Sequence, residues 1–182
     1  YRDILFRYDI LPEPDGAYSR IHRIHDDHVP VHLYFDVTIV PDILPADPSK
    51  LLLKRIDRKG KTIPAGGEWV DGALRASIRS FGDYAVYIDT IPPEIIPQNI
   101  ASGVIGPGRE TVRIKIRDED SGIKKYRATL NGRWLLMDYD AKNDLLVYEI
   151  DEHLLKGDNL FRLEVTDSRD NIAVFEKTLK RE

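Results

Sequence analysis

The sequence contains no cysteine, so neither a disulfide framework nor thiolate chemistry is available to it. It also lacks a run of apolar residues long enough to cross a bilayer. Neither sign of charge predominates, because 27 Lys and Arg residues are balanced by 31 Asp and Glu residues, for a formal net charge of −4. This balance gives no electrostatic reason to expect binding to nucleic acid or to an anionic membrane.

The signatures of several enzyme classes are missing as well. The sequence has no Gly-x-Ser-x-Gly nucleophile elbow, no P-loop and no dinucleotide-binding fingerprint. Carboxylates are plentiful, but a catalytic pair is defined by its geometry and not by composition. We therefore expect no enzyme activity from this chain and assign it no catalytic residue.

What the sequence does have is the composition of a globular protein, with 42% hydrophobic and 32% charged residues. Apolar and polar residues alternate in the segments 31–40, 111–117 and 160–167, which predicts strands with one buried face, as in antiparallel sheets. Segment 49–60 fits a helix or a strand, and we favour a strand. The residues expected to face a core are Val31, Leu33, Phe35, Val37, Ile39, Val112, Ile114, Ile116, Phe161, Leu163 and Val165.

Turn signals separate these segments. Asn131-Gly132 is the strongest of them, because both central residues of a type I′ hairpin turn need positive φ. Pro92-Pro93 follows a strand-like run, and proline cannot donate a hydrogen bond to a sheet. We therefore predict an all-β chain of two tandem antiparallel β-sandwich domains of immunoglobulin-like type, at residues 1–90 and 91–182.

Three segments around and after the two prolines carry a resemblance: DTIPPEI (89–95), IRDEDSGIKKYRATLNG (116–132) and KGDNLFRLEVTDSRDN (156–171). They resemble tandem bacterial immunoglobulin-like modules. With residues 67–90 and 132–151 added, the sequence is similar to the C-terminal region that follows the catalytic domain in a group of Gram-negative lysostaphin-type zinc metalloendopeptidases. Those enzymes cut peptide crosslinks in peptidoglycan.

The resemblance implies a fragment without the catalytic domain, and the chain does start at Tyr1 rather than Met. It implies an accessory, regulatory or binding module of a periplasmic or exported parent protein of the cell envelope. Its partners would be the parent's own catalytic domain, peptidoglycan or another envelope protein, and zinc would belong only to that missing domain. The alternative is an adhesin-like or carbohydrate-binding module of a surface protein that is not a peptidase.

A histidine-rich segment, IHRIHDDHVPVH (21–32), could suggest a metal site. His22 and Asp26 fit the His-x-x-x-Asp half of the lysostaphin-type zinc motif, but the sequence contains no His-x-His. A catalytic zinc needs three protein ligands and an open position. We therefore favour a structural surface role over metal binding, for which the candidate ligands would be His22, His25, Asp26 and His28.

Two further groups are candidate binding residues. Acidic turns contain Asp118, Asp120, Asp167 and Asp170, and carboxylate oxygens are calcium ligands; we favour local turn hydrogen bonds as their role. Trp69 and Trp134 could form a platform for sugar rings, but large aromatic residues usually fill a sandwich core. We favour burial, especially for Trp134, which adjoins an apolar run.

Overall fold

The computed structural model describes residues 7–27, 29 and 31–182, and in these residues all the regular structure is β-strand apart from one short 3₁₀ turn. The chain divides into two compact units, Tyr1–Thr90 and Ile91–Glu182. Each unit contains two sheets, built almost entirely from antiparallel strand pairs. The predicted class of tandem β-sandwiches is confirmed. In the described residues no helix is long and apolar enough to span a membrane.

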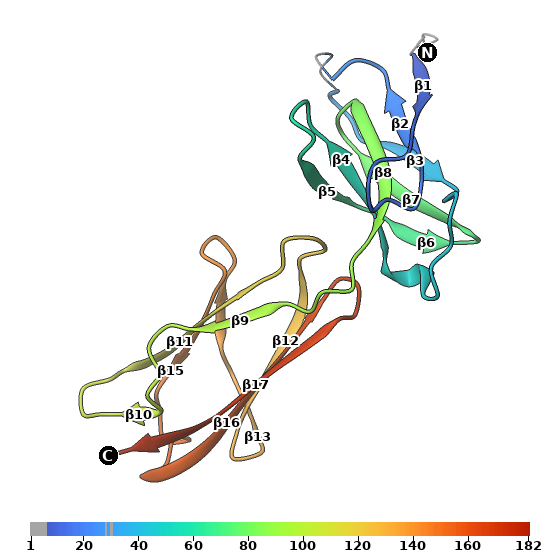
Figure 1. Cartoon of the computed structure of the whole chain (residues 1–182). Helices are drawn as coiled ribbons and strands as arrows, with labels where there is room; N and C mark the ends of the chain where they lie inside the picture. Colours follow the sequence, from blue (N-terminus) through green and yellow to red (C-terminus); the bar gives the residue numbers. More distant parts are fainter. Residues whose placement is uncertain (1–6, 28, 30) are drawn as a thin grey trace. The chain divides into compact units, whose positions relative to one another are not determined.

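The first unit packs a five-stranded sheet, in the order β1-β2-β8-β4-β5, against a three-stranded sheet in the order β3-β7-β6 (Figure 1). Its elements are β1 (Tyr8–Leu11), β2 (Ile21–Ile24), β3 (Phe35–Ile39), the 3₁₀ turn η1 (Pro48–Lys50), β4 (Leu51–Ile56), β5 (Thr62–Gly66), β6 (Glu68–Val70), β7 (Ala73–Ile78) and β8 (Gly82–Ile88).

The core of the first unit lies between these sheets. Leu51, Leu53 and Val86 are fully buried in it, so the strand expected in 49–60 is confirmed over Leu51–Ile56. The strand expected over 31–40 is present only as Phe35–Ile39. The predicted burial of Leu33 is wrong, since its side chain is 78% exposed. The strand is short because its pairing with β7 stops at Phe35, opposite Ile78.

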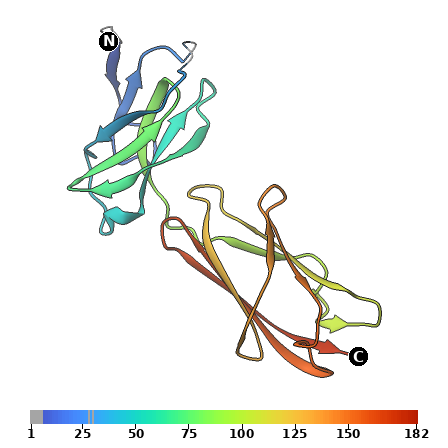
Figure 2. The ribbon, with the colours of Figure 1, turned by 180° about the vertical axis from the view of Figure 1, so that it is seen from behind.

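The second unit packs a four-stranded sheet, in the order β14-β15-β11-β9, against a five-stranded sheet in the order β10-β17-β16-β12-β13 (Figure 1, and from behind in Figure 2). The strands are β9 (Glu94–Pro97), β10 (Val104–Ile105), β11 (Thr111–Arg117), β12 (Ile123–Leu130), β13 (Arg133–Leu135), β14 (Asp138–Asp140), β15 (Leu145–Glu149), β16 (Gly157–Asp167) and β17 (Ile172–Arg181).

The alternation seen in the second half of the sequence is confirmed by burial. The six residues predicted to face the core here are all fully inaccessible: Val112, Ile114, Ile116, Phe161, Leu163 and Val165. Asn131 and Gly132 have φ values of 52° and 78°, the sign that a type I′ turn requires. Pro92 and Pro93 belong to no strand and lie between β8 and β9. Strand pairing thus stops at the prolines, as expected.

Candidate functional site

The two described histidines of the candidate metal group are held by different neighbours. His22, on β2, is half-buried, and its Nδ1 lies 2.6 Å from the Tyr8 hydroxyl. His25 follows β2, accepts a hydrogen bond at Nδ1 from the Arg7 backbone N–H (3.4 Å) and sets its ring edge-on to Phe81. No metal-ligand group formed by the described residues contains His22, His25 or Asp26, and His28 lies outside the described residues.

The environment of His22 makes stability depend on pH. Burial, opposed in part by Asp42, holds the pKa of His22 below its ordinary value of 6.5. The unfolded chain therefore takes up this proton first, and the free energy of unfolding is expected to fall as pH decreases through 6.5 toward the folded pKa. The measurement is urea denaturation at about pH 7.5 and about pH 5.5.

His22→Gln is expected to reduce this pH dependence, whereas His32→Gln, at an exposed position, serves as the matched control and should retain it. If the unaltered chain and His22→Gln showed the same pH dependence of the free energy of unfolding, His22 would not be its source.

The acidic turns of the second unit are occupied by local hydrogen bonds. Oδ1 of Asp118 accepts from the backbone N–H groups of Asp120, Ser121 and Gly122 at 3.2, 2.7 and 2.8 Å. The fully buried Asp167 does the same for the backbone N–H groups two and four residues later, at 2.8 Å each. These bonds support the favoured interpretation, in which the carboxylates fix the turns.

Fold topology brings the two turns together. Ser168 N–H donates to the Gly122 carbonyl (3.0 Å), and Lys124 Nζ pairs with Asp170 at 2.7 Å. Carboxylate oxygens of Asp118 and Asp167 lie within 4.8 Å of each other. Of the four proposed calcium ligands, the structure therefore brings only Asp118 and Asp167 close together. Each of these carboxylates already accepts at least two backbone hydrogen bonds.

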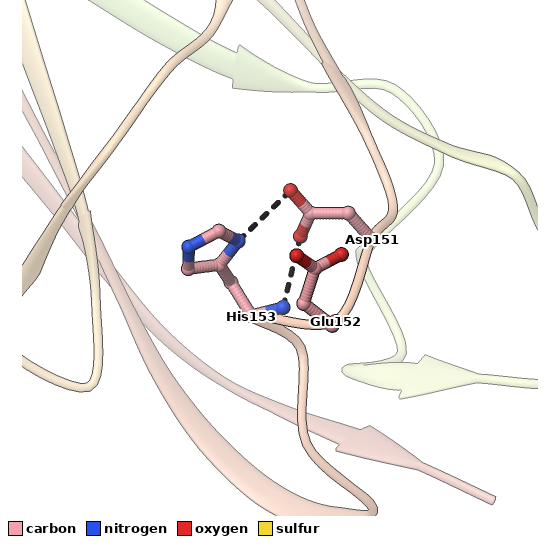
Figure 3. A group of neighbouring side chains, drawn as sticks. All are labelled: Asp151, Glu152 and His153. Carbon is pink, nitrogen blue, oxygen red and sulfur yellow. Dashed lines mark hydrogen bonds and ion pairs between the residues drawn. The ribbon is translucent and has the colours of Figure 1, made fainter.

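A group that the sequence analysis missed follows β15: Asp151, Glu152 and His153, all exposed (Figure 3). Asp151 Oδ2 lies 2.9 Å from His153 Nδ1, and its Oδ1 accepts from the backbone N–H of His153 at 3.0 Å. Asp151 Oδ1 also accepts from the Tyr148 hydroxyl (2.6 Å), and burial together with this bond raises the pKa of Tyr148 to about 12. These hydrogen bonds hold the turn, and Arg181 on β17 adds a bond to the Asp151 carbonyl at 3.3 Å.

The two tryptophans differ in exposure. Trp69, on β6, is half-buried and packs against the core of the first unit. The predicted burial of Trp134 is wrong, because its side chain is 63% exposed. Trp134 lies on the edge strand β13, and the buried residues nearby are Leu135, at the end of that strand, and Met137, just after it. Trp134 and Leu136 alternate with them and face solvent, each 63% exposed. Only Trp134 of the proposed platform is thus an exposed indole.

Polar side chains continue the surface from Trp134 across the sheet. Trp134 pairs with Thr129 on β12, Thr129 with Arg162 on β16, and Arg162 with Glu176 on β17. The flanking residues of β16 are buried, so Arg162 faces outward. Its guanidinium binds Glu176 at 3.0 Å. These four residues, which we call the Trp134 row, combine an indole face with hydroxyl, guanidinium and carboxylate groups.

Comparison with known proteins bears mainly on the first unit. Residues 1–89 match the family model of the Zu5-like domain. The first unit is therefore similar to a Zu5-like domain. No curated protein matches the sequence.

Among solved structures, the fibronectin(III)-like modules of Clostridium thermocellum CbhA are similar, with 11% identity over 97% of this chain and 95% of that chain and a TM-score of 0.39. The immunoglobulin-like part of the resemblance seen in the sequence agrees with the observed β-sandwiches. Neither the Zu5-like match nor this structural neighbour ties the chain to the narrower part of the resemblance, the lysostaphin-type peptidases.

Proposed function

We propose that the chain is a non-catalytic accessory module of a cell-envelope protein, and specifically a regulatory or binding region of a lysostaphin-type zinc metalloendopeptidase. The observation that carries the proposal is the structural use of the half zinc motif, since His22 is half-buried and bonded to Tyr8. The proposal that the parent protein is a lysostaphin-type peptidase rests on the sequence resemblance. In this proposal the module contacts the parent's catalytic domain, peptidoglycan or another envelope protein, in the periplasm or after export.

The test is to incubate the purified chain with insoluble peptidoglycan in EDTA, zinc or calcium, and to measure both the bound protein and the soluble muropeptides released. We expect no muropeptide release under any of these conditions, because catalytic zinc requires three protein ligands. Heat-denatured protein is the control for nonspecific adsorption. Zinc-dependent release would overturn the non-catalytic assignment, whereas calcium-dependent binding would assign the acidic turns a role as ligands.

A carbohydrate-binding surface module is the second candidate, and the exposure of Trp134 favours it. An exposed indole offers an apolar face on which the C–H face of a sugar ring can stack. The neighbouring Thr129 hydroxyl and the Arg162–Glu176 ion pair supply donors and acceptors for sugar hydroxyls. This candidate differs from the first in its parent protein, which need not be a peptidase.

Trp134→Ala is expected to weaken binding to insoluble glycan about ten-fold, a loss of about 1.4 kcal/mol, because it removes the stacking surface. Its free energy of unfolding should change by less than about 0.5 kcal/mol, as is usual for exposed positions. The measurement is a depletion isotherm on purified glycan strands and on cellulose.

Leu136→Ala is the matched control, since Leu136 is equally exposed on the same face. Equal losses from both variants would indicate unspecific apolar adsorption, and absence of binding by the unaltered protein would reject this candidate.

A further inference from the structure

One end of the first unit contains a hollow lined mainly by charged side chains. Antiparallel pairing creates it, because Ile24 at the end of β2 lies opposite Gly82 at the start of β8, and Ile56 at the end of β4 lies opposite Asp83. The turn between β4 and β5 also lines the hollow, with residues 57–60. We call this hollow the end basin. Its lining contains five Arg and Lys residues against four Asp residues.

Three of the four carboxylates in the end basin are held by charged or backbone donors. Asp83 receives the Arg23 guanidinium through two bonds of 2.7 Å. Asp27 receives two bonds from Arg58, at 3.0 and 2.6 Å. Asp57 accepts from the backbone N–H groups of the β4–β5 turn, two bonds of 2.8 Å. The negative charges of the basin are therefore largely neutralised by their own neighbours.

Arg55 is different from the arginines beside it. It is half-buried and lies on the core-facing side of β4, two residues beyond Leu53. Its Cδ lies 3.9 Å from the position that a Cβ on Gly82 would occupy, so the absence of a side chain there leaves space beside the Arg55 stem. Within the described part of the chain, Arg55 makes no ion pair with a carboxylate, and neither does Lys59.

We propose that the end basin binds a small oxyanion, a phosphate or carboxylate group, with Arg55 as its principal donor and Lys59 as a second cation. A guanidinium presents a planar fork that matches either group through two parallel hydrogen bonds. A half-buried guanidinium without a counterion has lost hydration that an incoming anion replaces. The bidentate pairs Arg23–Asp83 and Arg58–Asp27 hold the walls in place. This site is independent of the accessory and carbohydrate-binding functions proposed above.

The test is a titration of the ¹⁵N-labelled 182-residue chain with inorganic phosphate, followed by amide chemical shifts, with chloride adjusted to hold ionic strength constant. We expect saturable shifts at Arg55, Lys59 and Gly82. Arg55→Gln should weaken binding at least about ten-fold, the effect of losing a charge-assisted bidentate contact. Arg75→Gln removes a surface arginine of the same unit, one paired with Asp71, and should leave the affinity unchanged.

A parallel titration with succinate distinguishes the two sources of the oxyanion. If only phosphate saturates the shifts, the basin is a phosphate site. If only succinate does so, it is a carboxylate site. If both do so, the site selects only for charge and shape. Lys59→Gln, at an exposed turn, is the second variant if Arg55→Gln does not fold, and it should weaken binding about three-fold. The proposal would be overturned if the chemical shifts did not saturate. It would also be overturned if the tested variant, Arg55→Gln or Lys59→Gln, bound the oxyanion as tightly as the unaltered chain.

Discussion

Asn159→Ala is expected to lower the free energy of unfolding of the second unit by about 3 kcal/mol, although it removes only a small polar side chain. Asn159 is fully buried near the start of β16. Its Oδ1 accepts from the Leu155 backbone N–H and from the Asn131 amide, both at 2.9 Å. Its Nδ2 donates to the carbonyls of Leu155 (2.7 Å) and Gly157 (3.0 Å). Asn159 thus joins the β15–β16 loop to the β12–β13 turn.

The expected loss of stability is large because alanine cannot replace the hydrogen bonds that the Asn159 amide makes to backbone groups. Alanine leaves the buried Leu179 carbonyl (3.3 Å from Nδ2) and the partly buried groups of Leu155 and Gly157 without this partner. Each such group that gains no water destabilises the folded state by about 1–3 kcal/mol. The measurement is urea denaturation followed through amide signals of β12 and β16. Asn143→Ala is the matched control, because Asn143 is exposed and its side chain bonds locally to Asp140 at 2.6 Å. Equal destabilisation by the two substitutions would contradict the assigned role of Asn159.

Phe161→Ala is expected to destabilise the second unit by about 3–5 kcal/mol, the range for truncating a buried phenylalanine. Phe161 is completely inaccessible in the middle of the core, with its ring centroid 6.4 Å from that of Phe175. Alanine would leave a cavity between two sheets that are each fixed by their strand pairing, so the surrounding residues have little freedom to fill it.

Leu160→Ala tests the same strand on its other face. Leu160 adjoins Phe161 but is 51% exposed, and its truncation should change the free energy of unfolding by less than about 1 kcal/mol. Hydrogen exchange of the β16 amides would report both variants. A loss for Phe161→Ala no larger than that for Leu160→Ala would contradict the assignment of Phe161 to the core.

The sequence predicted strands best where buried and exposed residues alternate over most of the strand. In β11 and β16 the alternation of Val112, Ile114 and Phe161 with polar residues corresponds directly to burial. The segment around Leu33 shows the same alternation, yet it is not a strand, because its partner β7 does not extend that far. Alternation records which residues can share a face, whereas the length of a strand depends on a partner distant in the sequence.

Trp134 illustrates the same difference at the candidate site. Alternation separates Trp134 and Leu136 from Leu135 and Met137, but it does not say which pair faces the core. The end basin was also missed, because β2, the β4–β5 turn and β8 meet only through pairing. Its one local signal is the cluster of basic residues in KRIDRKGK (54–61).

Both units place a late-synthesised strand in the interior of their five-stranded sheet. β8, the last strand of the first unit, lies between β2 and β4, and β17, the last of the second, lies between β10 and β16. While a ribosome is still making either unit, the strands on both sides of the missing one have open edges that can pair with other chains. The first unit can close once Ile88 has emerged. In the nascent second unit the edge of β16 stays unpaired until β17 is complete.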